Sequence, residues 1–187
     1  SSSEIFEKSK KKLNERSNKN PQNPYGLAKL ESLLLVKFYR DNFKLNCFSG
    51  ILFNHESKLR PEYFFIPKVI DYIKKKKFNA KLKLGDLSAI KDFGWAEDYI
   101  QIIHKLIMQS RYEDYIIATG KSHKLTDVVK KIFKYYGLSW KKFVITDKQL
   151  NRPSENKTIY ANITKIKKIK IKPKKNLSFI IKQLCKN

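Results

Sequence analysis

The chain has 187 residues, of which 41% are hydrophobic, so it is long enough to bury a core as one domain or as two small ones. No apolar run approaches the roughly 20 residues that a membrane span needs, and the polar start of the chain does not resemble a secretory leader. Cys47 and Cys185 lie far apart without a C-x-x-C pattern, which argues against a zinc site and predicts a reduced, cytoplasmic setting.

The net charge of +24 makes nucleic acid the first partner to consider. Lysines cluster at 8–12, 74–77 and 165–175, and the 10 Tyr and 12 Phe residues are able to stack on bases. However, only five of the 41 basic residues are arginine, the side chain best suited to bidentate contacts with phosphate and guanine. We therefore interpret the excess lysine as a solvated surface and keep a lysine-rich nucleic-acid-binding module as an alternative of a different functional class.

The first third of the chain predicts a loop, a long helix and a strand. Residues 7–24 are polar and contain Asn, Ser and Pro, which is typical of a loop. Residues 25–43 predict one helix whose apolar positions spread around most of its circumference, as in a helix that is buried on more than one side. The run "LNCFSGILF" (45–53) predicts an interior strand whose carboxyl end opens onto the polar residues 54–57.

The rest of the chain alternates between the two periodicities. It predicts a helix after Pro67, a strand at 80–87, a helix at 95–110, a strand at 114–120, a helix at 124–137 that ends at glycine, a basic helix after 162 and a short helix at 177–184. Strands that alternate with helices indicate an α/β fold with a parallel sheet. No G-x-G-x-x-G or G-x-x-x-x-G-K motif occurs, so this chain holds no usual cradle for a pyrophosphate.

Tyr25 and Lys29 are four residues apart at the start of the long helix and therefore share one face. A nearby ammonium group favours the phenolate and lowers the pKa of a tyrosine, which can then act as a general base on a hydroxyl group. The spacing is a weak signal by itself, because a polar pair at the rim of a helix has the same pattern.

Two polar clusters accompany this pair. The start of the chain, "SSSEIF", contributes the hydroxyl of Ser2 and the carboxylate of Glu4. The run "GILFNHESKLRPEYFFIPK" places several polar side chains after the predicted strand: Asn54, His55, Glu56, Arg60 and Lys68. Although a lone histidine is more often a structural residue, a dense polar cluster at this point is where α/β folds bind ligands.

Six motifs in a fixed order carry a resemblance to a known family: "SSSEIF", "NPYGLAKL", "GILFNHES", "LGDLSAIKDFGWAEDY", "DYIIATG" and "RPSE". The set resembles the GDP-mannose 4,6-dehydratases, which belong to the extended short-chain dehydrogenase/reductase family. The resemblance covers nearly the whole chain and corresponds to the C-terminal portion of such enzymes, without their glycine-rich N-terminal half. It implies a C-terminal fragment that is inactive by itself.

The resemblance also implies an architecture. We expect the C-terminal part of a doubly wound Rossmann-type fold together with a smaller α/β substrate-binding domain. Residues 1–56 and 90–119 would belong to the NADP-binding domain, and residues 57–89 and 120–187 would bind the GDP-sugar. The helix at 25–43 would pack against its copy in a homo-oligomer, a dimer or a tetramer, and no membrane partner is expected.

By resemblance, the reaction is that of an NADP-dependent hydro-lyase acting on GDP-mannose: oxidation at C4, loss of water across C5–C6, and return of the hydride to C6. Tyr25 aligns with the tyrosine that takes the proton of the C4 hydroxyl, and Lys29 with the lysine that tunes it and holds the nicotinamide ribose. Glu4 aligns with the base that removes the C5 proton. Ser2 replaces the usual threonine that hydrogen-bonds the C4 oxygen.

The binding residues follow from the same alignment. His55 and Arg60 match positions that contact NADP, whereas the residues that match substrate-contacting positions are Asn54, Lys68, Lys91, Arg152 and Glu155. Lys91 replaces an arginine of the family and loses its bidentate contact with phosphate. Ile66 and Pro67 replace a threonine–arginine pair. Another nucleotide-sugar epimerase or dehydratase and a catalytically dead remnant remain the alternatives within the superfamily.

Overall fold

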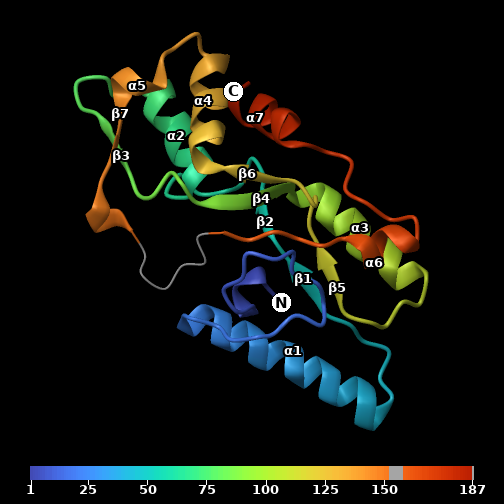
Figure 1. Cartoon of the computed structure of the whole chain (residues 1–187). Helices are drawn as coiled ribbons and strands as arrows, with labels where there is room; N and C mark the ends of the chain where they lie inside the picture. The colour runs from blue at the N-terminus through green and yellow to red at the C-terminus, as the bar shows by residue number, and fades with distance from the viewer. Residues whose placement is uncertain (152–157, 187) are drawn as a thin grey trace.

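The computed structural model describes residues 1–151 and 158–186. Short strands alternate with helices along the chain (Figure 1), which confirms the predicted α/β class. In chain order the elements are η1 (Ser3–Ile5), α1 (Pro24–Phe43), β1 (Gly50–Leu52), β2 (Asn54–Glu56), α2 (Phe65–Lys74), β3 (Leu82–Leu84), β4 (Ile90–Trp95), α3 (Ala96–Met108), β5 (Tyr115–Ile117), β6 (Ser122–Lys124), α4 (Leu125–Tyr135), α5 (Trp140–Phe143), β7 (Val144–Thr146), η2 (Lys148–Leu150), α6 (Thr164–Lys168) and α7 (Leu177–Cys185). Within the described part of the chain, none of the helices combines the length and apolarity needed to cross a bilayer.

Parallel pairing dominates the strands. β1 lies parallel to β5, with Leu52 opposite Ile117, and Ser2 forms a further parallel bridge to Leu52. The start of the chain, β1 and β5 therefore run side by side and end at the same edge. β2 pairs in parallel with β4, which is also antiparallel to β6, and β3 pairs in parallel with β7.

The buried apolar side chains form two clusters. The first, which we call the strand core, packs η1, β1, β5 and α3 together and includes Ile5, Ile51, Tyr99, Leu106 and Ile116. The second, the helical core, is built mainly from α2, α4 and α7 and includes Val69, Val128, Ile132, Phe133 and Ile180. Figure 1 shows α2, α4 and α7 at one end of the molecule and α1 at the other, with the β2–β4–β6 sheet between them. The domain boundaries expected from the sequence stay a prediction.

The interior strand expected at 45–53 is shorter than predicted. Only Gly50–Leu52 is extended and paired, and the polar stretch Asn54–Glu56, expected as an open cluster after the strand, is itself β2. The reason is the neighbouring β4, which offers a backbone partner for each of these three residues. The sequence did not reveal β4, because its charged residues Lys91 and Asp92 interrupt the apolar pattern of a buried strand.

Local sequence explains the limits of α1. Asn23 is the N-cap, its side chain accepts from the backbone N–H of Gly26, and Pro24 occupies the first helical position. The helix ends at Lys44, which adopts the left-handed conformation with φ 54°. The predicted helix at 25–43 is therefore confirmed almost to the residue.

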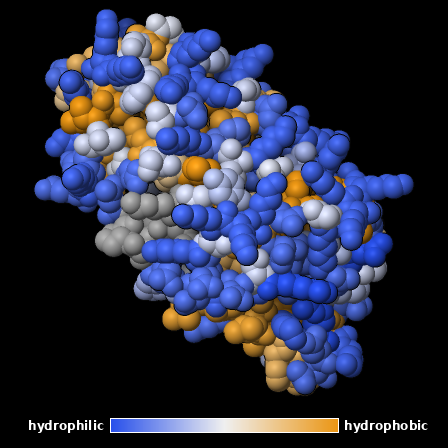
Figure 2. Space-filling view, in the orientation of Figure 1, coloured by the Kyte–Doolittle hydropathy of each residue, from blue (hydrophilic) through white to orange (hydrophobic). Residues whose placement is uncertain are grey.

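The predicted burial of α1 is wrong for the single chain. Of its twenty residues only Gly26 and Leu33 are buried, and a row of large apolar side chains is exposed: Tyr25, Leu27, Leu34, Leu35, Phe38, Tyr39 and Phe43. Figure 2 shows hydrophobic side chains along the lower edge of the molecule, where Figure 1 places α1. A helix of this kind packs on the strand core along one narrow stripe only, so the apolar residues on its other sides stay uncovered in one copy.

Candidate functional site

Three chain segments end together at the carboxyl edge of the parallel strands. In the register of the sheet, Ser2 lies opposite Leu52, and Leu52 lies opposite Ile117. The residues that follow these positions therefore meet at one edge, which is where open α/β sheets place their ligand sites. They are the η1 turn with Glu4, the start of β2, and the turn after β5.

The η1 turn and the first turn of α1 form one unit. The Oγ atom of Ser2 accepts a hydrogen bond from the backbone N–H of Glu4 at 3.3 Å, and Glu4 Oε2 accepts from Asn23 Nδ2 at 3.1 Å. A Cβ atom at Gly26 would lie 2.5 Å from the carbonyl oxygen of Glu4. Only glycine at this position allows the helix to approach the turn so closely.

Tyr25 and Lys29 lie beside this unit. Tyr25 is 56% exposed, and Lys29 Nζ is 5.5 Å from the centre of its ring. The backbone of Lys29 is tied to the start of the chain, because Ser1 Oγ donates to its carbonyl oxygen at 3.1 Å. The structure thus brings together four predicted residues that span 28 positions of sequence: Ser2, Glu4, Tyr25 and Lys29.

β2 carries Asn54 and His55, both half-buried, at the same edge. The Nδ1 atom of His55 is 2.9 Å from the carbonyl oxygen of Phe53, and the imidazole is 5.6 Å from the ring of Tyr99. His55 lies opposite Gly94 in the register, and a Cβ atom at Gly94 would be 2.3 Å from the Tyr99 ring. The glycine of "DFGWAEDY" is therefore explained, because Tyr99 occupies the space beside His55.

Tyr99 is buried, and its hydroxyl has no hydrogen-bond partner among the described residues. Burial raises the pKa of Tyr99 well above its ordinary value, and the carboxylates of Asp92 and Asp98 add to the effect. The Tyr99 phenol therefore stays protonated, and His55 packs against an uncharged ring.

Glu56 and Arg60 form a partly buried ion pair just beyond the edge. Glu56 Oε2 is 3.4 Å from Arg60 Nε, and the guanidinium carbon lies 3.7 Å from the centre of the Phe64 ring. Burial raises the pKa of Glu56 to about 7, and the charge of Arg60 acts against this rise. The stacking and the ion pair together restrict the direction of the Arg60 side chain.

The remaining predicted binding residues lie farther along the chain, in other elements. Lys68 is on α2, where its Nζ atom donates to the carbonyl oxygen of Lys83 at 3.2 Å. Lys91 is buried in β4 opposite His123 of β6. Arg152 and Glu155 lie outside the described residues.

Sequence reasoning did not single out two residues that shape this edge. Asn23 connects Glu4 to α1, and the dipeptide Asn23-Pro24 at a helix start is the signal that could have identified it. Asp92 accepts hydrogen bonds from the backbone N–H groups of Thr119 and Gly120 and from the Thr119 hydroxyl. Burial raises the pKa of Asp92, although these hydrogen bonds oppose the rise. No local sequence pattern predicts a contact of this kind, because its partners lie in the turn after β5, 27 and 28 residues along the chain.

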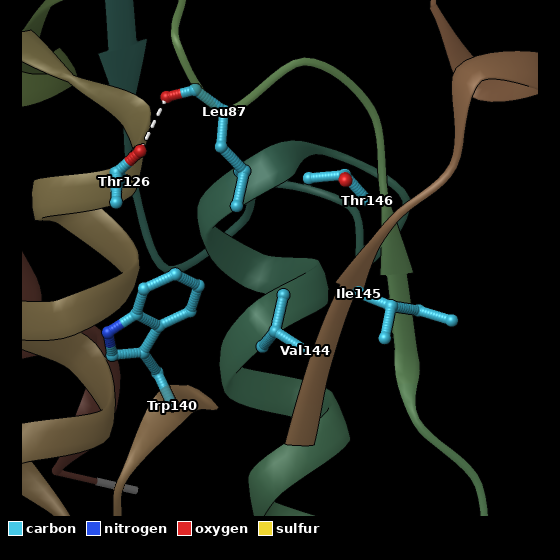
Figure 3. A pocket seen from close by; sticks show the side chains of 6 residues that line it. All are labelled: Leu87, Thr126, Trp140, Val144, Ile145 and Thr146. Carbon is cyan, nitrogen blue, oxygen red and sulfur yellow. Dashed lines mark hydrogen bonds between the residues drawn. The ribbon is translucent and has the colours of Figure 1, made fainter. Parts of the chain in front are cut away.

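A separate surface pocket lies in the helical-core half. Figure 3 shows its lining, with the Thr126 hydroxyl donating to the carbonyl oxygen of Leu87 at 2.8 Å. Most of the lining is apolar and comes from α4, α5 and β7: Leu87, Thr126, Trp140, Val144, Ile145 and Thr146. None of the predicted site residues contributes to this pocket.

Comparisons with known proteins show the family of the chain. Residues 1–184 match the family model described as GDP-mannose 4,6 dehydratase. The chain belongs to the GDP-mannose 4,6-dehydratase family. It is 32% identical over 186 residues to GDP-mannose 4,6 dehydratase 1 of Arabidopsis thaliana, covering 98% of this chain and 52% of that protein. The chain thus spans about half the length of the curated relatives that it matches.

Solved structures show the same fold. RMD from Pseudomonas aeruginosa, complexed with NADPH, superposes with a TM-score of 0.87 at 15% identity, covering 100% of this chain and 63% of that one. The dTDP-glucose 4,6-dehydratase of Bacillus anthracis, in complex with NAD, gives a TM-score of 0.86 at 20% identity, covering 100% and 60%. The chain therefore has the Rossmann-type fold of the extended short-chain dehydrogenase/reductase enzymes.

Proposed function

We propose that this chain carries the catalytic groups of a GDP-mannose 4,6-dehydratase, a hydro-lyase that converts GDP-D-mannose into GDP-4-dehydro-6-deoxy-D-mannose. The observation that carries the proposal is the joint placement of a carboxylate and a phenol. Glu4 is tied to the N-cap of α1, and Tyr25 and Lys29 lie on the first turns of the same helix. Family membership supplies the reaction that such a pair would perform.

Tyr25 acts first, as the base on the C4 hydroxyl of the sugar. Its exposed phenol is accessible to substrate, and Lys29 Nζ lies 5.5 Å from the centre of the ring. Ser2 has a hydroxyl at the same edge and would hydrogen-bond the C4 oxygen. The three side chains together hold the reacting oxygen and take its proton.

Glu4 acts next. A carbonyl group at C4 makes the neighbouring C5 proton acidic, so a carboxylate is a strong enough base to remove it. The electrons of the C5–H bond form the C5–C6 double bond, and the C6–O bond breaks. The departing hydroxyl takes up the proton that Glu4 removed from C5 and leaves as water, so Glu4 is again a carboxylate and charge and protons balance.

A nicotinamide dinucleotide, when bound, supplies the hydride acceptor at C4 and the hydride donor at C6. The donor groups on this chain fit such a ligand: Lys29 Nζ and the terminal nitrogens of Arg60 form no hydrogen bonds within the described residues, and both side chains carry a positive charge. Lys29 would hold the ribose, while Arg60 and His55 would contact the nucleotide. NADP is the cofactor that we propose.

These residues account for only part of the cofactor contacts, because the chain has no glycine-rich phosphate motif. We therefore expect the 187 residues alone to be inactive. The nucleotide-sugar would be held by Asn54, Lys68 and Lys91 together with Arg152 and Glu155. The ammonium group of Lys91 is a point charge and cannot make a bidentate contact with phosphate. It is therefore expected to bind phosphate more weakly than an arginine would.

The exposed apolar face of α1 supports a homo-oligomer, in which two copies would cover this face. Both described cysteines are free, which is consistent with the proposed cytoplasmic setting.

Two substitutions in the complete enzyme test the assignment. Tyr25→Phe removes the base and should abolish C4 oxidation of GDP-mannose, whereas Tyr39→Phe, on the same helix but away from the site, should leave turnover unchanged. Glu4→Gln should stop after oxidation and accumulate the 4-keto sugar without loss of water. Wild-type turnover by Tyr25→Phe would contradict the role of Tyr25. Normal product from Glu4→Gln would contradict the role of Glu4 as the base at C5.

A further inference from the structure

Asn23 makes two hydrogen bonds with the two ends of its side-chain amide. The Oδ1 atom accepts from the backbone N–H of Gly26 at 2.7 Å and so caps α1. The Nδ2 atom donates to Glu4 Oε2 at 3.1 Å. One side chain therefore connects the helix that carries Tyr25 to the carboxylate of Glu4.

Capping alone does not require an asparagine. Aspartate and serine cap helices about as well, because the cap needs only an oxygen acceptor. The chain shows this simpler case at α7, where Asn176 Oδ1 accepts from Phe179 N at 2.9 Å. Within the described residues, the amide nitrogen of Asn176 donates to no side chain, so the second contact distinguishes Asn23.

The backbone around Glu4 is restrained as well. The Ser2 hydroxyl accepts from the N–H of Glu4, and the helix backbone at Gly26 lies directly against the Glu4 carbonyl oxygen. Once the backbone is held, the Glu4 side chain keeps its own freedom of rotation, and the Asn23 amide removes much of it. Among the described residues, Glu4 Oε1 forms no hydrogen bond, so it is the oxygen left free to accept a proton.

We propose that Asn23 is a positioning residue that holds the Glu4 carboxylate, with one oxygen bonded and the other free, for removal of the substrate's C5 proton. This inference rests on the proposed function, in which Glu4 is that base. In this proposal Asn23 acts through Glu4 and not through a contact of its own with the substrate. Its effect is confined to the elimination step, since oxidation at C4 depends on Tyr25 and Lys29.

Asn23→Asp separates the two contacts. The aspartate keeps an acceptor for Gly26 N–H and so keeps the cap, but it cannot donate to Glu4 and places a second negative charge beside it. In the complete enzyme with GDP-mannose, we expect elimination to slow by about 10- to 100-fold, because a displaced general base loses rate on this scale. Oxidation, measured as the first-turnover change in nicotinamide absorbance, should stay within about threefold of the wild type.

Three further measurements make the result specific. Asn23→Gly is tolerated at an N-cap, adds no charge and has no side-chain donor for Glu4, so it should show the same selective loss of elimination. Exchange of the C5 proton with deuterated water should slow in both variants, and a merely structural role would not change this exchange relative to oxidation. Asn176→Asp, the matched change at the N-cap of α7, should leave both steps unchanged.

The outcomes separate the two proposals. If Asn23→Asp and Asn23→Gly lower oxidation and elimination equally, or leave C5 exchange at the wild-type rate, Asn23 is only a helix cap and the inference is overturned. If Glu4→Gln eliminates water normally, the role of Glu4 fails instead. Accumulation of the 4-keto sugar by both Asn23 variants, with a normal Asn176→Asp enzyme, supports the inference.

Discussion

Helices α1 and α4 both carry many apolar residues, yet they relate to the molecule in opposite ways. α4 has 11 residues and buries Val128, Val129, Ile132 and Phe133 on one stripe. α1 has 20 residues and buries only Gly26 and Leu33, although large apolar side chains occur along its whole length.

The difference lies in what each helix packs against. α4 faces α2 and α7, and the three helices cover one another within the chain. α1 faces the strand core along a single line, so its other apolar sides require a second surface. The helical core is therefore complete in one copy, whereas the apolar face of α1 stays exposed in one copy, as the proposed homo-oligomer requires.

The largest effect should come from emptying the helical core. Phe133 is fully buried and its ring lies 6.0 Å from that of Phe143, so Phe133→Ala should lower the free energy of unfolding by about 3–5 kcal/mol. Phe38→Ala on α1, where the ring is 52% exposed, is the matched control, and under monomeric conditions it should change stability by no more than about 0.5 kcal/mol. Urea unfolding measures the free energy of unfolding of both variants. Equal losses of stability in the two would contradict the comparison of α4 with α1.

An intermediate effect on stability is expected from the titration of Glu56. This residue of β2 lies buried opposite Trp95 of β4, between the two cores. Burial raises the pKa of Glu56 from 4.5 to about 7, so the folded state holds its proton more tightly than the unfolded state does. The proton on Glu56 contributes its full stabilisation of the folded state below pH 4.5. This contribution, about 3 kcal/mol in total, is lost as the pH rises through about 7.

Glu56→Gln tests this expectation, because it keeps the shape and removes the titration. Unfolding curves between pH 4 and pH 8, roughly the window set by the two pKa values, should show a shallower decline of stability in the variant than in the wild type. Parallel curves for the two proteins would mean that Glu56 does not titrate in this range.

The smallest effect on stability should come from the α1 face. Leu34 and Phe38 are each 52% exposed and one helical turn apart, so replacing both by serine should leave the monomer's stability within about 1 kcal/mol of the wild type. Self-association should weaken by about tenfold or more, since the apolar face is interrupted at two central positions. Analytical ultracentrifugation over a range of concentrations measures this, with Lys37→Ser between them as the control. An unchanged association constant would show that copies meet elsewhere.

Prediction from the sequence worked best where the signal is local. The helix at 25–43 has a capping asparagine, a proline at the first position and a sustained apolar pattern, and its observed limits are Pro24–Phe43. The helix at 124–137 ends near Gly137, which has φ +69° and tolerates that conformation without strain. The strand at 114–120 was visible as a short apolar run, and its paired part is Tyr115–Ile117.

The features that sequence reasoning missed depend on contacts between segments far apart in the chain. β4 contains Lys91 and Asp92 in the middle of a buried strand, and only its partners β2 and β6 make that arrangement favourable. Asp92 is acceptable inside the protein because three hydrogen-bond donors from residues 119 and 120 surround it. A pattern of neighbouring residues carries no information about such partners.

The sequence by itself determined the family, the order of the motifs and the positions of Tyr25, Lys29 and Glu4, because these depend on residue type and spacing. The tertiary structure decided that Glu4 meets the cap of α1 through Asn23, that Gly26 and Gly94 leave room for a carbonyl and a ring, and that α1 is left uncovered. The physical reason is that hydrogen bonds, close contacts and burial arise between segments far apart in the chain, where packing rather than local propensity selects the neighbours.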